Sequence, residues 1–372
     1  MSALCITGSP CRRYIFEEGR IGYIDAAKGF GIFLIVLGHV TRYEPLVGFL
    51  YSFHVPVFFI VSGAFFKSVP FADFVRKKLR TLVIPYFVFA ALSTLYWLII
   101  ERRFRDGSVS PLSVVANVFF MSGGPDVYAQ NAALWFLPAL FVAEILFYWM
   151  DAAAKYNPGA RFAFPVVTYL LGMIVAGAVN HIGIRLPFMA DVALLAMAWY
   201  SLGFCLNPLL LRFLPQKRGR ASRIAWLVAC WMFGVAPWLL VDLAGVSVNY
   251  GDLVFSDSIM PAVTGTIGFC FVLFMSIALE EGAVRDLGRR SLGVMCAHEP
   301  IKRVVIKLAE TTTRLTGTFL RDGVLVPLVL AVITITCACT VTVALERFAP
   351  WALGGGRSRR GLLRIRTGQD EE

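Results

Sequence analysis

Long apolar stretches recur along the whole chain, each bounded by a proline, a glycine, a charged residue or a short polar loop. A helix that crosses a bilayer needs about 20 mostly apolar residues. The weakest candidate, 291–301, runs on into Lys302, Arg303 and Lys307. The pattern predicts an all-α, polytopic integral membrane protein with about ten transmembrane helices, near residues 21–40, 46–66, 81–100, 132–150, 162–179, 187–206, 224–241, 258–279, 291–301 and 323–346.

The composition excludes a soluble fold. Hydrophobic residues make up 58% of the 372-residue chain and the mean hydropathy is +0.71, which is more apolar surface than the interior of a soluble protein can bury. We expect three regions: a cytoplasmic N-terminal tail at 1–20, a transmembrane domain at 21–346 and a basic cytoplasmic C-terminal tail at 347–372.

The net charge of +11 is divided unevenly between the two sides of the predicted membrane. Alternate loops and both tails hold 24 Lys and Arg residues, whereas the loops on the opposite side hold 10. Because basic residues near span ends stay in the cytoplasm, both termini are predicted to lie inside (N-in/C-in). This distribution accounts for the charge without nucleic acid as a partner. It is typical of a multi-pass protein of the bacterial inner (cytoplasmic) membrane.

Ionisable residues inside spans are costly to bury, so each is a candidate functional group. The first span carries Asp25, Lys28 and His39. Lys28 and His39 are eleven residues apart, which is three helical turns and about 16 Å along one face, and Asp25 can pair with Lys28. Glycines on the same helix let another helix or a ligand approach closely. The structural alternative is that Lys28 snorkels to the headgroups and His39 makes an interhelical hydrogen bond.

His54 lies in the second span and is expected in the outer half of the helix next to His39. The two histidines could line a reaction chamber or bind a metal or haem. No third ligand follows at a metal-binding interval, so no metal site is predicted. Ser62 and His298 are further chamber candidates, and each could instead serve packing or an interhelical hydrogen bond.

The loop 67–80 ends in a basic cluster directly before an apolar run. Cations beside the free N–H groups at a helix start bind anions, so Arg76, Lys77 and Arg80 are candidate phosphate ligands. Orientation by the positive-inside rule is the alternative. Glu144 lies in the middle of a span with no cation nearby in the sequence, and it is a candidate catalytic carboxylate or else an interhelical hydrogen-bonding group.

Several blocks of the chain form a series: Tyr23-Ile24-Asp25-Ala26-Ala27-Lys28-Gly29 through Gly38-His39, Phe53-His54-Val55-Pro56-Val57-Phe58-Phe59-Ile60-Val61-Ser62-Gly63, Lys77-Leu79-Arg80 leading to Ile84-Pro85-Tyr86, Leu134-Trp135-Phe136-Leu137, and Leu287-Gly288-Arg289-Arg290-Ser291-Leu292 to His298. In this order the series resembles the acyltransferase 3 family, the membrane O-acyltransferases that acylate sugars and related acceptors. Within the family it is most similar to the fucose 4-O-acetylase-like group, which has Lys at position 28. Many other members carry Arg at the positions of Lys28 and Lys77.

The resemblance implies a donor and an acceptor. The donor is expected to be cytoplasmic acyl-CoA, usually acetyl-CoA, used as a substrate with no permanently bound cofactor. The acceptor is expected to be a hydroxyl of a cell-surface or lipid-linked carbohydrate. The phosphate-rich head of CoA would lie on Arg76, Lys77 and Arg80, and its arm would pass Lys28 along the glycine-rich face to reach His39.

In this interpretation His39 is the general base that activates the acceptor hydroxyl, a task suited to an imidazole, whose ordinary pKa is about 6.5. Glu144 is the carboxylate expected to orient the ring, and Asp25 and Lys28 complete the predicted catalytic set. An acetyl-histidine intermediate stays open as a variant.

Two other classes of function are alternatives. A transporter or flippase for a lipid-linked sugar would use the polar face of the first span as a pathway, but we find neither internal repeats nor matching discontinuous helices in the sequence. A bis-histidine redox protein would show haem absorbance. The sequence carries no signal for an oligomeric state.

The predicted topology can be tested with single-cysteine variants of a cysteine-free chain. Cysteines near residues 44 and 250 should react with a membrane-impermeant reagent from outside, because their loops hold few basic residues. Cysteines near 216 and 358 should react only after the membrane is opened. Labelling from outside near 216 would contradict the orientation and, with it, a cytoplasmic donor.

Overall fold

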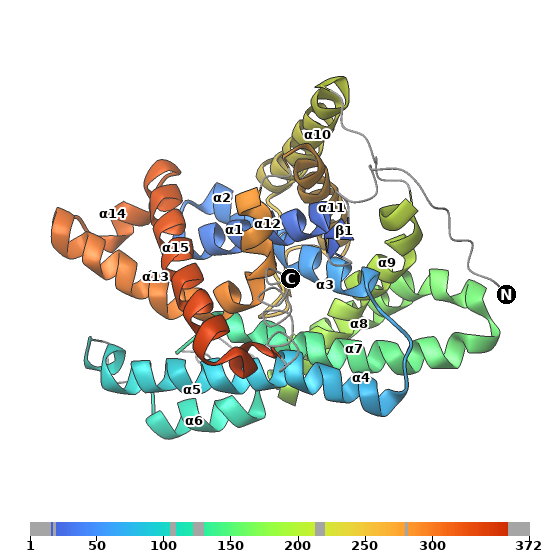
Figure 1. Cartoon of the computed structure of the whole chain (residues 1–372), viewed down its shortest axis with the longest axis horizontal. Coiled ribbons are helices and arrows are strands. Elements are labelled where there is room, and N and C mark those ends of the chain that lie inside the picture. Colours follow the sequence, from blue (N-terminus) through green and yellow to red (C-terminus); the bar gives the residue numbers. More distant parts are fainter. Residues whose placement is uncertain are drawn as a thin grey trace, which may run out of the picture.

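The computed structural model describes residues 16–17, 20–104, 109–121, 130–212, 220–279 and 282–355, which form a helical protein (Figure 1). The first half contains α1 (Gly22–Val40), α2 (Glu44–Tyr51), α3 (His54–Ala64), α4 (Phe71–Lys78), α5 (Ile84–Ile99), α6 (Pro111–Phe120) and α7 (Phe136–Ala153). The second half contains α8 (Phe164–Ile182), α9 (Ala190–Arg212), α10 (Arg220–Ala244), α11 (Met260–Ala278), α12 (Gly282–Arg289), α13 (Ser291–Thr313), α14 (Gly317–Arg321) and α15 (Leu325–Phe348).

Short elements connect these helices. A π-helical turn, η2 (Leu79–Val83), joins α4 to α5, and the 3₁₀ turns are η3 (Glu101–Phe104), η4 (Ala132–Trp135), η5 (Ala154–Tyr156), η6 (Pro158–Ala163), η7 (Pro187–Met189) and η8 (Pro350–Leu353). Within the described ranges the strands form two antiparallel pairs of two residues each, β1 (Phe16–Glu17) with β2 (Arg20–Ile21) and β3 (Val248–Asn249) with β4 (Val254–Phe255).

The prediction of an all-α, polytopic membrane protein is confirmed. By length and composition, nine helical segments of the described chain can cross a membrane: Gly22–Val40, Glu44–Ala64, Phe71–Ile99, Ala132–Ala153, Pro158–Ile182, Pro187–Leu210, Ser222–Ala244, Met260–Ala278 and Leu325–Phe348. The predicted span at 291–301 is not among them. It is the first half of α13, which continues into Lys302, Arg303 and Lys307 and is therefore too charged to qualify.

Nine crossings would leave the residues before Gly22 and those after Phe348 on opposite sides of the membrane. The N-in/C-in orientation requires α13 to act as a tenth crossing among other helices, and it stays a prediction.

Helix α1 lies near the centre of the molecule, with α3, α12 and α15 close to it (Figure 1). It also packs against α2, α11 and α13. In its most apolar window 78% of the residues are buried, against 22% for the segment that contains α8 and 11% for the segment that contains α10. The residues of α1 therefore face protein, whereas α8 and α10 present most of their side chains outward.

Glycine allows the closest helix contacts. A Cβ atom on Gly63 of α3 would collide with the carbonyl oxygen of Tyr200 on α9. In the same way, a Cβ atom on Gly203 of α9 would collide with the carbonyl oxygen of Ile60 on α3. The two helices thus approach each other backbone to backbone, as small residues permit in membranes.

This packing predicts a contrast between two glycines. Gly203→Ala should destabilise the protein by about 1–3 kcal/mol, the usual cost of overpacking, because the new methyl group has no room beside Ile60. Gly177→Ala on α8 is the matched control, since a Cβ atom there meets no atom within 4 Å. Thermal unfolding in detergent measures both; an unchanged midpoint for Gly203→Ala would contradict the close approach of α3 and α9.

Candidate active site

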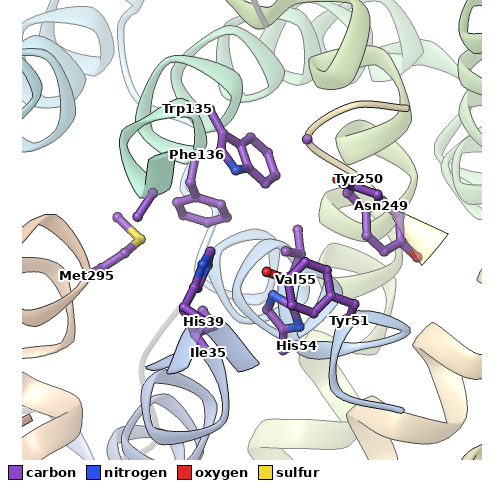
Figure 2. A pocket seen from close by; sticks show the side chains of 12 residues that line it. Ile35, His39, Tyr51, His54, Val55, Trp135, Phe136, Asn249, Tyr250 and Met295 are labelled. Atoms are coloured by element: carbon purple, nitrogen blue, oxygen red, sulfur yellow. The ribbon is translucent and has the colours of Figure 1, made fainter. Parts of the chain in front are cut away.

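His39 is the last-but-one residue of α1 and lines two cavities, of about 50 and 940 Å³. The cavities share Tyr51, Trp135, Asn249 and Gly251 in their walls, so the smaller opens beside the larger. Figure 2 shows the imidazole of His39 pointing into the smaller cavity, next to Phe136 and across from Tyr51. The ring is thus placed where a bound molecule can reach it.

A carboxylate of α13 holds this imidazole. Nδ1 of His39 lies 3.2 Å from Oε1 of Glu299, whose side chain is only 2% exposed. An ionised carboxylate accepts hydrogen bonds and cannot donate them, so Nδ1 is the nitrogen that donates to Glu299. When the ring is neutral, Nε2 keeps its lone pair, which is the form that a general base needs.

Glu299 belongs to a buried network of charges. Its two oxygens contact the ammonium of Lys302 and the guanidinium of Arg303. Arg303 also donates to both carboxylate oxygens of Glu101, at 3.0 and 2.8 Å, and to the carbonyl oxygen of Gln130. The carboxylate of Glu299 is thus held by two cationic groups as well as by the imidazole.

The backbone of His39 is fixed as well. Arg321 of α14 donates from Nε to the carbonyl oxygen of Val40 at 2.7 Å and from Nη2 to that of His39 at 3.1 Å. The last carbonyl groups of a helix have no partner within the helix, and a cation suits the negative end of the helix dipole. Arg321 thus caps α1 at the end that carries His39.

The larger cavity is closed on one side by the turn between β3 and β4. Asn249 and Asp252 lock this turn, since Asn249 Nδ2 donates to Asp252 Oδ2 at 2.8 Å and the N–H of Asp252 donates to Asn249 Oδ1 at 3.1 Å. Arg185 donates to the carbonyl oxygen of Gly251. A Cβ atom on Gly251 would press on the indole of Trp135, so this glycine lets the turn lie against the aromatic wall.

The other two predicted histidines lie near His39 in different environments. His54 begins α3, lines the smaller cavity and contacts the carbonyl oxygen of Leu50 through Nδ1 at 2.6 Å; the ring of Tyr51 is near both His54 and His39. His298 is fully buried with its ring 5.2 Å from that of His39. Its Nδ1 contacts the carbonyl oxygen of Met295 at 2.7 Å, and its Nε2 has no hydrogen-bond partner in the described part of the chain.

Ser62 lies near the end of α3 and lines neither of these cavities. The neighbouring Gly63 faces α9, so this part of the motif serves helix packing. The structure does not bring Ser62 to His39.

His39, His298 and Glu299 each offer an atom within 4.8 Å of the others and could in principle hold a metal ion. However, both oxygens of Glu299 already contact the cationic groups of Lys302 and Arg303. A divalent cation in this position would be repelled by these two groups and would have to displace them from the carboxylate. The arrangement suits proton transfer better than metal binding.

At the other end of α1, the predicted pair of Asp25 and Lys28 is present, with 3.8 Å between Lys28 Nζ and Asp25 Oδ1. Asp25 also lies 3.5 Å from Nε of Arg289 on α12. Other helices fill the space beside the nearby glycines, since Gly29 faces Val284 of α12 and Gly31 faces Phe58 of α3. The expectation that an acyl-CoA arm runs along this face is corrected, because helices occupy the space.

Glu144 does not lie beside His39, and the prediction that it orients the ring is wrong. Its Oε1 lies 2.6 Å from Nζ of Lys78, while Oε1 of Glu299 is the atom next to His39. Glu144 is 2% exposed, so the nearest cation neutralises it, and that cation comes from α4, 66 residues earlier in the chain.

The basic cluster was expected just before a helix start, and this expectation is also corrected. Arg76 and Lys77 lie in α4, Arg80 lies in η2, and the helix continues without a break into α5. The N–H groups after Arg80 are therefore not free. Arg76, Lys77 and Arg80 are exposed, whereas Lys78 turns inward to Glu144.

The sequence did not single out Glu299, Lys302 and Trp135 as site residues, although the structure groups them around His39. A signal was present for Glu299, which is an ionisable residue next to His298 in a predicted span. Its role depends on its contact with His39, which is 260 residues away, and no local pattern reveals such a contact.

A family model described as an acyltransferase domain matches residues 21–346. No curated protein and no solved structure matches the chain.

The contacts of Glu299 predict a protein that does not depend on metal. Purified protein should contain far less than one metal ion per chain by plasma mass spectrometry, and a chelator should leave its thermal midpoint unchanged, because Lys302 and Arg303 occupy the carboxylate. A stoichiometric metal ion, or a fall of several degrees with chelator, would contradict this interpretation.

Proposed function

Since the chain belongs to the acyltransferase 3 family, we propose that it transfers an acyl group, acetyl above all, from acyl-CoA to a hydroxyl of a cell-surface or lipid-linked carbohydrate. The family makes it an acyltransferase, and its nine candidate spans make it a multi-pass membrane protein. The observation that carries the finer proposal is the His39–Glu299 pair, which places an imidazole held by a carboxylate at a cavity of about 940 Å³.

In the proposed reaction, Nε2 of His39 takes the proton of the acceptor hydroxyl while its oxygen attacks the carbonyl carbon of the thioester. An ester C–O bond forms and the C–S bond breaks. The leaving thiolate receives the proton from the imidazolium and departs as the thiol. Glu299 accepts from Nδ1 and stabilises the transient positive charge of the ring, as the carboxylate of a catalytic triad does.

The walls of the larger cavity support a carbohydrate as the acceptor. Trp135 offers an aromatic surface, and Asn249 offers an amide that both donates and accepts hydrogen bonds. Glu44, Asp242 and Asp252 also line the cavity, and their carboxylates can accept hydrogen bonds from sugar hydroxyls. A few polar groups on an aromatic wall are the usual way in which a pocket orients a polar ligand.

For the donor we propose that the phosphates of acyl-CoA lie on the exposed cations Arg76, Lys77 and Arg80. Arginine and lysine bind phosphate through charge-assisted hydrogen bonds. The exposure of these side chains supports this assignment, because Lys78 of the same helix turns inward to Glu144 while the other three cations stay open to a ligand. In the N-in orientation this helix would face a cytoplasmic donor, and the C-terminal end of α1 would face an outer acceptor.

The base assignment predicts that His39→Ala lowers the rate of acetyl transfer by about 10²–10⁴, the range for loss of a general base. Radiolabelled acetyl incorporation in membranes with equal amounts of protein measures this effect. Binding of acyl-CoA should be retained. His181→Ala is the matched control, since His181 is an exposed histidine of α8 that lines neither cavity.

The same variants, produced in cells that lack the native protein, should differ in the O-acetyl content of their surface glycans, with His39→Ala giving little or none. Near-normal transfer by His39→Ala would remove the mechanism and would favour the transporter alternative.

The donor assignment predicts a selective effect on the Michaelis constant (KM). Replacing Lys77 and Arg80 together with Ala should raise the KM for acyl-CoA by a hundredfold or more, since each charge-assisted phosphate contact is worth about 1.5–3 kcal/mol. The KM for the acceptor should change little. Lys155→Ala, at another exposed lysine, controls for general loss of charge; equal changes in both constants would indicate a defect in folding or orientation instead.

A further inference from the structure

A third cavity, of about 530 Å³, lies where α13 turns into α14. Three arginines line it: Arg42 from the end of α1, Arg314 from the end of α13 and Arg321 from α14. Thr316 and Thr318 also line it. The arginines are the cationic groups of this cavity, and Arg42 and Arg314 are exposed, so the cavity is open to solvent.

Among the described residues, the positive charge in this cavity has no carboxylate at ion-pairing distance. In the part of the chain that the structure describes, no carboxylate forms an ion pair with any of the three arginines. Glu310 lines the same cavity but pairs with Lys307 at 3.0 Å. Burial and then the nearby guanidinium of Arg42 lower the pKa of Arg321, and the carboxylate of Glu299 opposes this shift only in part. An anion in the cavity would relieve the repulsion between the two guanidinium groups.

The arginine cavity is joined to the site. Arg42 and Arg321 line both this cavity and the larger cavity that contains His39. Arg321 is also the residue that donates to the carbonyl oxygens of Val40 and His39. A ligand that lies in both cavities would contact Arg42 and Arg321 with its anionic part. Its neutral part would reach the imidazole of His39.

Charged groups of both signs line the larger cavity, where Lys302 and the shared Arg42 and Arg321 lie in the same wall lining as four carboxylates, whereas the arginine cavity has three arginines and one carboxylate, that of Glu310. Glu44, Asp242 and Asp252 line the larger cavity, and these carboxylates would repel an anion while accepting hydrogen bonds from hydroxyls. Arg42 and Arg321 line both cavities, and Arg314 lines the arginine cavity alone. We propose, on the basis of the function proposed above, that the acceptor carries a phosphate or diphosphate group next to its sugar and that Arg42, Arg314 and Arg321 bind this group.

Phosphate chemistry fits these side chains better than a single carboxylate does. Guanidinium groups bind phosphate through paired N–H donors, and three of them suit an anion of charge −2 or more. The same oxyanion chemistry occurs on a glycosyl phosphate or diphosphate and on the headgroup of an anionic lipid. The experiment must separate these two sources.

Inorganic diphosphate is the probe, used with the full-length protein in vesicles of phosphatidylcholine, which has no net charge. Saturating CoA is present so that the donor site is occupied. Arg42→Gln and Arg314→Gln should each weaken diphosphate binding at least tenfold, because each loses a charge-assisted contact. Arg103→Gln should bind like the wild type, since Arg103 is exposed and lines neither cavity.

In acetyl-transfer assays, diphosphate should compete with the acceptor and not with acyl-CoA, and Arg314→Gln should be less sensitive to it. Equal diphosphate affinity in all variants would overturn the proposal. Displacement of the probe when phosphatidylglycerol is added to the vesicles would also overturn it, because the cavity would then bind a lipid headgroup. The absence of any acetyl transfer by the wild type would refute the proposed function instead, and the binding result would stand by itself.

Discussion

Glu299 is a residue of α13 whose side chain is only 2% exposed. Its carboxylate contacts His39 of α1 and the cationic groups of Lys302 and Arg303. A charge so deeply buried is tolerated only when it is paired and hydrogen-bonded, and removal of one partner costs about 3–5 kcal/mol. The partners of Glu299 therefore hold several elements together: Arg303 extends the network to Glu101 of η3, and His39 extends it to α1. Through this network, the first half of α13 packs inside the protein despite the charge of Glu299 and Lys302.

The same pairing gives the site its chemistry. His39 is held by its side chain at Glu299 and by its backbone at Arg321, so the ring keeps one nitrogen directed away from the carboxylate. Aromatic and amide groups of Trp135 and Asn249 face it across the cavity. A fixed base beside a roomy, polar cavity is suited to activating a hydroxyl of a bound ligand, because positioning accounts for much of the catalysis.

Hydropathy predicted nine of the spans because each is set by some twenty consecutive residues, and the pair of Asp25 with Lys28 was predicted because it lies within one helical turn. The sequence did not reveal which residues far apart in the chain contact each other. Sequence alone does not show which face of α7 meets α4, so Glu144 was assigned to His39 although it pairs with Lys78. The sequence also does not show that α4, η2 and α5 form one continuous helix. No new helix therefore begins at the basic cluster.

The central claim is that Glu299 acts through His39, and a double-mutant cycle tests it most directly. Acetyl-transfer rates would be compared for the wild type, His39→Gln, Glu299→Gln and the double variant, each at equal amounts in membranes. Residues that act as one unit are not additive, so the account predicts that the double variant is no slower than His39→Gln alone. A double variant slowed by the product of the two single effects would contradict it, because Glu299 would then act independently of the histidine.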